Sequence, residues 1–255
     1  MDHHYLCGII QEIEIKENIK ILYACESGSR AWGFPSLDSD YDIRFIYQRR
    51  KNDYLSVFSI EEDIKYPIVG DLDIYGWDIR KVLKLLYKSN CTLYEWLQSP
   101  ICYGDYSFFK NDFITLLDYA PNLRAHMHHY LGLCHRKMEG LDQSNILLKE
   151  FLYIARSLLS ALWIETNRSY APMEMKDLMQ LLPSDLIKSL ESIIMIKASV
   201  REDFIFSPDE KLCIYMKNTF KKLKDTVMTI PALKMSVEPV NSYFIDLIRK
   251  EDDDN

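Results

Sequence analysis

The chain has 255 residues, of which 48% are hydrophobic, and carries a formal net charge of −7 at pH 7. This length can bury a sizeable core in one large domain or two modest ones. The acidic balance excludes a bulk electrostatic attraction to nucleic acid and leaves room only for a local basic patch. No run approaches the ~20 apolar residues of a membrane span, and the N-terminus lacks the pattern of a signal peptide. We therefore expect a cytoplasmic protein with no membrane partner.

Six cysteines are scattered along the chain without the paired spacing of a zinc site or a disulfide framework. Most of them lie in apolar surroundings, which favours reduced side chains in a core. This usage is typical of a cytosolic protein. The six are Cys7, Cys25, Cys91, Cys102, Cys134 and Cys213.

The first third of the chain mixes short apolar runs with helical patterns. A helix is predicted over 9–16 and a strand over 19–25. The small pair Gly28-Ser29 then begins a short helix that Pro35 ends. We further expect strands over 40–47, 54–59 and 68–75, followed by a helix over 79–87 with Asp78 as its N-cap.

Most of the remaining chain carries apolar residues at helical spacing. Helices that follow a small mixed β-sheet predict an α+β fold class. We expect a mixed-sheet domain with flanking helices over 1–102, an α-helical domain over 103–250 and an acidic tail over 251–255. The helical patterns cover residues 93–98, 112–119, 123–139, 146–167, 173–181, 185–197 and 208–228.

Two aspartates stand at alternate positions where the strand over 40–47 begins. Asp40 and Asp42 would project from one face of that strand, because residues two apart share a face. Two carboxylates this close are unfavourable unless a cation lies between them, and Mg²⁺ prefers such oxygen ligands. Arg44, two residues after Asp42, would project from the same face of the strand, so it would pair with these acids or with a phosphate.

The Gly28-Ser29 turn lies ten residues before these acids. Its backbone N–H groups, the serine hydroxyl and the positive end of the following helix together suit phosphate oxygens. A phosphate-binding turn followed by paired carboxylates indicates chemistry on a nucleoside triphosphate.

The spacing of these motifs resembles the signature of the DNA polymerase β-like nucleotidyltransferase superfamily. Gly28-Ser29 is followed, after ten residues, by Asp-Tyr-Asp-Ile at 40–43. The longer wording, Gly-Ser-Arg-Ala-Trp-Gly and then Ser-Asp-Tyr-Asp-Ile-Arg, resembles the bacterial branch of predicted nucleotidyltransferases associated with RNA repair. Further similarity at 73–81, 93–100 and 149–159 extends the resemblance over about residues 20–180.

The resemblance implies a third carboxylate on a neighbouring strand. Asp71 and Asp73 lie on one face of the strand predicted over 68–75, and either could serve. We favour Asp73, because its Asp-Ile-Tyr context matches the branch, and keep Asp71 as the alternative third ligand. Asp40, Asp42 and Asp73 would then be the catalytic residues and would hold two Mg²⁺ ions, with Mn²⁺ as the alternative ion.

Five further residues are candidates for binding the nucleotide. Gly28, Ser29 and Arg30 belong to the predicted phosphate turn, where Arg30 is either a phosphate clamp or a surface arginine. Lys149 and Arg156 stand two helical turns apart, on a helix that the resemblance places along the cleft. They would contact phosphate or base, or else Arg156 would flank the core.

The resemblance implies that an NTP donates a nucleotide monophosphate to a hydroxyl acceptor, with release of pyrophosphate. The acceptor would be an RNA end, a small molecule or a protein. The alternative is a nucleotide-binding pseudo-enzyme, or a toxin–antitoxin component that acts through binding. The sequence predicts neither the base of the NTP nor the oligomeric state.

Overall fold

The computed structural model describes residues 1–117, 122–142 and 145–253, and it has the predicted α+β fold class. The chain forms two compact units, neither of which is one consecutive segment. The sheet unit contains the described parts of Met1–Ser27, Asp40–Pro121 and Lys234–Asn255. The helical unit contains the described parts of Gly28–Ser39 and Asn122–Leu233.

This division differs from the expected boundary near residue 102. Residues 28–39 belong to the helical unit, whereas α12 (Val237–Asp253) belongs to the sheet unit, where it packs on α4 (Ile79–Tyr87). An amphipathic pattern shows which face of a helix is buried but not what buries it, so the pattern could not assign these segments. The expected tail over 251–255 falls at the end of α12 and partly outside the described residues.

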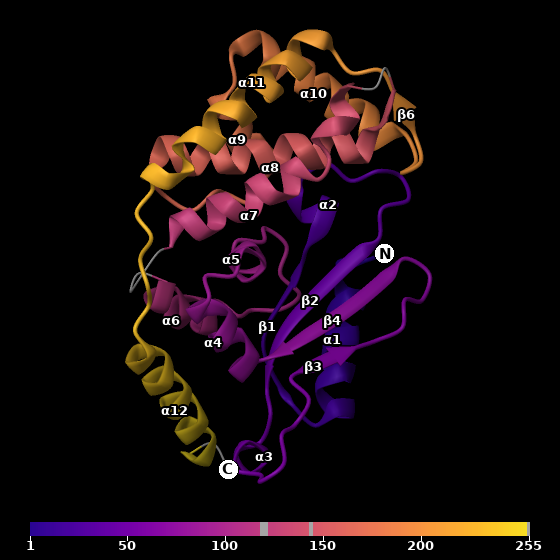
Figure 1. The fold of residues 1–255 in the computed structure, drawn as a ribbon. Helices are drawn as coiled ribbons and strands as arrows, with labels where there is room; N and C mark the ends of the chain where they lie inside the picture. The colour runs from indigo at the N-terminus through magenta and orange to yellow at the C-terminus, as the bar shows by residue number, and fades with distance from the viewer. Residues whose placement is uncertain (118–121, 143–144, 254–255) are drawn as a thin grey trace. The chain divides into compact units, whose positions relative to one another are not determined.

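A four-stranded mixed sheet forms the centre of the sheet unit, in the strand order β1-β2-β4-β3 (Figure 1). β1 and β3 are antiparallel to their neighbours, whereas β2 and β4 are parallel to each other. In this parallel pair, Asp42 lies opposite Asp73. The strands are β1 (Lys20–Glu26), β2 (Tyr41–Gln48), β3 (Asp63–Lys65) and β4 (Leu72–Asp78).

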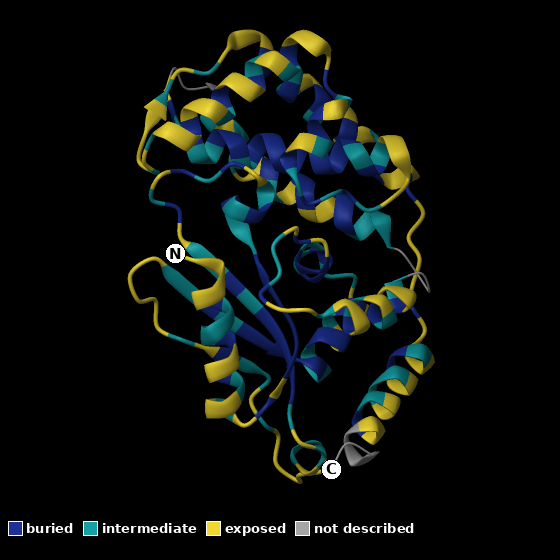
Figure 2. Ribbon diagram, turned by 180° about the vertical axis from the view of Figure 1, so that it is seen from behind, coloured by how far each residue is buried: buried dark blue, intermediate teal, exposed yellow. Residues whose placement is uncertain are grey.

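Helices cover the sheet and complete the core of this unit. α1 (His3–Glu17) shares a buried hydrophobic cluster with β1, β2 and β4, and its outer side is exposed (Figure 2). Trp77 of β4 stacks on Trp96 of α5 (Cys91–Leu97), with ring centroids 3.8 Å apart. The unit also contains α3 (Lys51–Tyr54) and α6 (Ser107–Leu117).

The edge of the sheet differs from the sequence prediction. No strand forms over 54–59, and β3 instead supplies the edge strand next to β4. Val57 and Phe58 are 94% and 83% exposed, so this apolar run gains no burial by pairing with the sheet. The predicted cap is confirmed: Asp78 accepts a hydrogen bond from the backbone N–H of Arg80 and begins α4.

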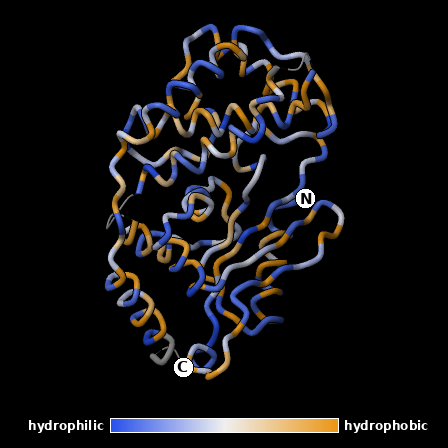
Figure 3. The backbone as a smooth tube through the Cα atoms, in the orientation of Figure 1, coloured by the Kyte–Doolittle hydropathy of each residue, from blue (hydrophilic) through white to orange (hydrophobic). Residues whose placement is uncertain are grey.

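α8 (Leu148–Asn167) is the central helix of the helical unit. Its side chains are buried along most of its length, and α7, α9, α10 and α11 pack on it. Hydrophobic and hydrophilic residues are interspersed along these helices, as expected of helices that bury one face (Figure 3). Within the described residues, no helix combines the length and apolar character needed to cross a membrane. The surrounding helices are α7 (Leu123–His135), α9 (Met175–Leu178), α10 (Ser184–Ser199) and α11 (Glu210–Thr226).

The segment between β1 and β2 contributes α2 (Gly28–Trp32) to the helical unit. Trp32 anchors it there, with its ring 5.2 Å from the ring of Tyr153 on α8. A small two-stranded sheet of β5 (Ile146–Leu147) and β6 (Ile205–Phe206) completes the unit.

Candidate functional site

The acidic cluster of the sheet unit consists of Glu26, Asp42, Arg44 and Asp73. Asp42 and Asp73 face each other across the parallel register of β2 and β4. The Nη2 atom of Arg44 lies 2.7 Å from Asp42 Oδ1 and 2.7 Å from Asp73 Oδ2. Because one nitrogen reaches both carboxylates, these two oxygens are no more than twice that distance apart.

Arg44 compensates the charge of this carboxylate pair. Its side chain is 15% exposed, and those of Asp42 and Asp73 are 27% and 26% exposed, so all three are partly withdrawn from water. Its Nη1 atom also donates to the backbone oxygen of Asp73 at 2.9 Å. One guanidinium neutralises only one of two carboxylates, so the cluster keeps an excess of negative charge that favours a further cation.

Glu26 is the member of the acidic cluster that the sequence analysis missed. It ends β1, is fully buried, and accepts a hydrogen bond from the backbone N–H of Asp42 at 2.8 Å. Its other carboxylate oxygen accepts a hydrogen bond from the hydroxyl of Tyr103. These bonds hold the start of β2, and therefore Asp42, against the end of β1. An acid that ends an apolar strand, two residues before Gly28, was the available signal.

Asp40 and Asp71 both lie outside the strands that were predicted to carry them. β2 begins at Tyr41, so Asp40 precedes it and is exposed. Asp71 is exposed in the turn before β4, and its backbone oxygen accepts a hydrogen bond from Tyr41 N at 2.7 Å. The register of β2 and β4 therefore places Asp73 opposite Asp42, while Asp40 and Asp71 precede the two strands.

The donor set decides how a metal ion could be held here. In the described part of the chain, no group of three or more His, Cys, Asp or Glu side chains is arranged to hold a metal ion. Mg²⁺ is commonly held by one or two carboxylates, while phosphates and water fill its other positions. Asp42 and Asp73 converge on one cation and fit that role as a pair. The three-carboxylate set that includes Asp40 stays a prediction.

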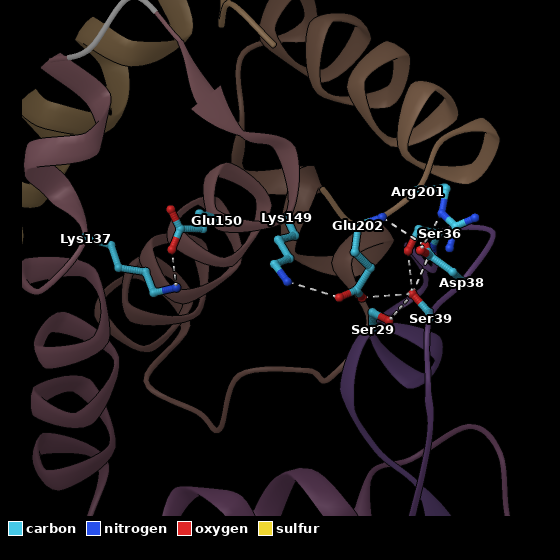
Figure 4. A network of polar contacts seen from close by, with 9 residues as sticks. All are labelled: Ser29, Ser36, Asp38, Ser39, Lys137, Lys149, Glu150, Arg201 and Glu202. Atoms are coloured by element: carbon cyan, nitrogen blue, oxygen red, sulfur yellow. Dashed lines mark hydrogen bonds and ion pairs between the residues drawn. The ribbon is translucent and has the colours of Figure 1, made fainter. Parts of the chain in front are cut away.

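The serine cluster of the helical unit consists of Ser29, Ser36, Ser39, Lys149 and Glu202 (Figure 4). All three serines are buried. The Oγ atom of Ser39 accepts from Ser29 Oγ at 3.0 Å, contacts Ser36 Oγ at 2.8 Å and donates to Glu202 Oε1 at 3.4 Å. Glu202 Oε2 accepts from Lys149 Nζ at 3.1 Å. The cluster therefore brings the Ser39 hydroxyl and one ammonium group to the carboxylate of Glu202.

Two more cations lie at the serine cluster. The guanidinium of Arg30 donates to the backbone oxygen of Ser39 at 2.8 Å. Lys197, in the last turn of α10, is only 1% exposed, and within the described residues its Nζ has no hydrogen-bond partner. Burial lowers the pKa of Lys197, as does the nearby Lys149, while Glu202 and Asp38 act in the opposite direction. Asp38 adds a second carboxylate to the site, but it pairs with Arg201 at 3.2 Å. Glu202 is therefore left to balance Arg30, Lys149 and Lys197.

Arg156 lies in the core of the helical unit. It is 4% exposed, its Nε donates to the backbone oxygen of Met173 at 3.1 Å, and its guanidinium lies 4.4 Å from the ring centroid of Trp32. These contacts match the alternative in which Arg156 flanks the core. A contact between Arg156 and a nucleotide stays a prediction.

The predicted site residues thus divide between the two units. Gly28, Ser29, Arg30, Lys149 and Arg156 belong to the helical unit, whereas the aspartates belong to the sheet unit. Gly28 has φ of +62°, a backbone conformation that favours glycine. Ser39, Lys197 and Glu202 were not predicted, because no local pattern in the sequence links them to the Gly-Ser turn.

Comparisons with known proteins agree with the predicted resemblance. The model of the RNA repair pathway DNA polymerase beta family matches residues 3–246. Uncharacterized protein YcgL of Bacillus subtilis (strain 168) is 40% identical over 171 residues, which cover 67% of this chain and 66% of that protein, just under two thirds of its length.

A nucleotidyltransferase-like protein from Exiguobacterium sibiricum 255-15 aligns with 96% of this chain and 80% of its own, at 12% identity and a TM-score of 0.32. At this TM-score and identity the alignment describes a distant likeness only. The family match covers nearly the whole chain and includes both predicted motifs. The chain therefore belongs to the RNA repair pathway DNA polymerase beta family.

Proposed function

We propose that the protein is a nucleotidyltransferase that transfers a nucleoside monophosphate from an NTP to a hydroxyl acceptor and releases pyrophosphate. The observation that carries this proposal is the contact of Asp42 and Asp73 with one guanidinium nitrogen. Two carboxylates at matching positions of parallel strands form a place where positive charge is required. Membership of a DNA polymerase beta family supports the same reaction class.

The carboxylates have distinct roles in this proposal. Asp40, Asp42 and Asp73 would hold two Mg²⁺ ions, or alternatively Mn²⁺, with Asp71 as the alternative to Asp73. A divalent cation supplies charge neutralisation for phosphate oxygens and a lower pKa for the acceptor hydroxyl. Asp73 would accept the proton of that hydroxyl as it attacks the α-phosphorus. Glu26 is a positioning residue, because it acts on Asp42 through the backbone N–H.

The serine cluster is proposed to bind the phosphate groups of the NTP. Ser29, Arg30 and Lys149 now donate to a hydroxyl, a carbonyl and a carboxylate respectively. Groups that donate to a carboxylate oxygen are equally suited to a phosphate oxygen. Gly28 supports this role, since it has a positive φ and, as a glycine, no side chain between its backbone and a phosphate.

An RNA end is the acceptor that the family description favours, because that description names an RNA repair pathway. The net charge of −7 requires that the contact with RNA be local. The alternative acceptors are a hydroxyl on a small molecule and a hydroxyl on a protein.

Nucleotide binding without transfer is a second candidate function. The observation that favours it is the position of Arg44, whose guanidinium already bridges Asp42 and Asp73. A protein of this kind would bind NTP through the serine cluster and release no pyrophosphate.

Incubation of the protein with each α-labelled NTP tests these functions, in the presence of Mg²⁺ or Mn²⁺ and of total RNA, total protein or a small-molecule extract. We expect label transfer to one acceptor class together with pyrophosphate release. Asp42→Asn and Asp73→Asn should abolish both. Glu12→Gln, an exposed acid on α1, is the matched control and should retain activity.

The outcomes separate the two functions. Equal label transfer by wild type, Asp42→Asn and Asp73→Asn would show that the acidic cluster is not catalytic. NTP binding without label transfer or pyrophosphate release in any arm would support the second function instead. Asp71→Asn, compared with Asp73→Asn, assigns the third carboxylate, because only the residue that takes part should lower the rate.

A further inference from the structure

Cys25 and Cys102 lie directly opposite each other where residues 101–103 pair with the end of β1. Backbone hydrogen bonds of 2.9 Å flank the pair, from Glu26 N to the Ile101 oxygen and from Tyr103 N to the Ala24 oxygen. Neither bond joins the two cysteines themselves, so they occupy a non-hydrogen-bonded position of an antiparallel pair. Such positions bring Cα atoms to about 4.5 Å, within the range of about 4.4–6.8 Å that disulfides span.

The two thiols also project to the same side. Opposite residues of an antiparallel pair share a face, and the hydroxyl of Tyr23, two residues before Cys25, interacts with both sulfur atoms. The distance from Tyr23 Oη to Cys102 Sγ is 3.6 Å. Cys102 also raises the pKa of the Cys25 thiol, after the larger effect of burial, which agrees with two sulfur atoms close together.

We propose that Cys25 and Cys102 are a redox modification site and form a reversible disulfide when an oxidant such as a peroxide is present. Both cysteines are reduced in this structure. Cys25 is fully buried, whereas Cys102 is partly exposed. An oxidant therefore meets Cys102 first. The inference does not rest on the proposed function.

The chemistry proceeds in two balanced steps. The Cys102 thiolate attacks one oxygen of hydrogen peroxide, the O–O bond breaks, and hydroxide leaves and takes up a proton to become water. Cys25 sulfur then attacks the sulfur of the Cys102 sulfenic acid and displaces hydroxide, which takes the Cys25 proton and leaves as a second water. Two sulfur atoms lose one electron each, and the peroxide gains both. Attack by an external dithiol reverses the bond.

The disulfide would tie together two segments that already support the acidic cluster. Glu26 follows Cys25 and Tyr103 follows Cys102, and these two residues are joined through the hydrogen bond between their side chains. Because the cysteines are far apart in the chain, the cross-link removes many conformations from the unfolded state. We expect oxidation to raise Tm on the order of 5 °C or more.

The test treats the purified full chain with hydrogen peroxide at an equimolar amount, blocks the remaining thiols and maps the peptides without reduction. We expect a loss of the mass of two hydrogen atoms, one cross-linked peptide pair that contains Cys25 and Cys102, and reversal by dithiothreitol. Cys102→Ser should remove the cross-link and the rise in Tm. Because Cys102 is partly exposed, this variant should fold even if Cys25→Ala does not.

Cys7→Ser is the matched control, because Cys7 is the other partly exposed cysteine of the sheet unit. It should retain the cross-link. The proposal is overturned if, in the wild type, Cys102 forms a disulfide with Cys7 instead of Cys25. It is equally overturned if Cys102 oxidises to sulfinic acid while Cys25 stays a free thiol.

Discussion

The acidic cluster around Asp42 and the serine cluster around Ser39 contain opposite charge excesses. In the first, carboxylates converge on one guanidinium, that of Arg44. In the second, Ser39 and Lys149 contact the carboxylate of Glu202, while the other carboxylate, that of Asp38, pairs with Arg201. Each cluster is only partly compensated from within, so the acidic cluster favours a further cation and the serine cluster a further anion.

This difference separates two kinds of role that a single activity assay would merge. A group that holds charge developing at the reacting atoms lowers the barrier, whereas a group that binds a remote phosphate lowers both ground state and transition state. We therefore expect changes in the acidic cluster to affect kcat and changes in the serine cluster to affect KM. Removal of a cation should also lower the free energy of unfolding in the acidic cluster and raise it in the serine cluster.

The largest expected effect is on catalysis. Asp42→Asn should lower kcat roughly 10³-fold, because the amide loses the charge that the reaction requires. Lys149→Met should instead raise KM for NTP about tenfold, since it removes the proposed charge-assisted bond to phosphate. Steady-state kinetics of both variants measure the split. Equal losses of kcat in the two variants would show that the clusters do not have separate roles.

The next effect concerns the cation between the carboxylates. Arg44→Met should lower the free energy of unfolding by about 3 kcal/mol at pH 7, because it leaves two partly buried carboxylates uncompensated. Millimolar Mg²⁺ should restore part of this loss if the pair binds it. Urea unfolding with and without Mg²⁺ measures both changes. An Arg44→Met protein as stable as wild type without Mg²⁺ would contradict the repulsion.

The stability of the protein should depend on pH through a buried histidine of the helical unit. His126 on α7 is 2% exposed, and burial, with a smaller effect of His129, lowers its pKa to about 4. The unfolded chain binds this proton near pH 6.5 but the folded chain only near pH 4. The free energy of unfolding should therefore fall as pH falls from 6.5 to 4, by at most about 3 kcal/mol.

His126→Gln should flatten this part of the stability curve, measured by urea unfolding at a series of pH values. Glu12→Gln provides the comparison, since Glu12 is exposed. An unchanged slope in His126→Gln would mean that other groups cause the acid sensitivity.

The smallest effect tests whether the excess positive charge of the serine cluster lowers the free energy of unfolding. Lys197→Met removes a buried ammonium without changing the length of the side chain much, and it should raise the free energy of unfolding by about 1–2 kcal/mol. Lys149→Met, which removes a half-exposed ion pair, should change it by about 0.5 kcal/mol or less. Thermal and urea unfolding compare the two. A destabilised Lys197→Met would show that its ammonium is better satisfied than the structure indicates.

Local patterns were enough for several features of the fold and the site. The apolar run that became β1, the cap at Asp78 and the choice of α+β class follow from short-range preferences that neighbouring residues supply. The resemblance favoured Asp73 over Asp71, whereas the position of Asp73 opposite Asp42 depends on the register of β2 and β4. Family membership followed from the same motifs.

Parity failed where a strand boundary was misplaced. Asp40 was counted with Asp42, but β2 begins one residue after it. The strand over 54–59 failed for a related reason, since an apolar run forms a strand only where a sheet edge can bury it.

The sequence by itself determined the candidates for the chemistry: the Gly-Ser turn, the paired aspartates and their spacing. Only the tertiary structure decided which distant residues come into contact. Glu26 meets Asp42, Glu202 meets Ser39, and Cys102 meets Cys25 through contacts between segments far apart in the chain. Side-chain periodicity records which face of an element is buried, but charge compensation depends on which segments meet, and that is settled by packing over the whole unit.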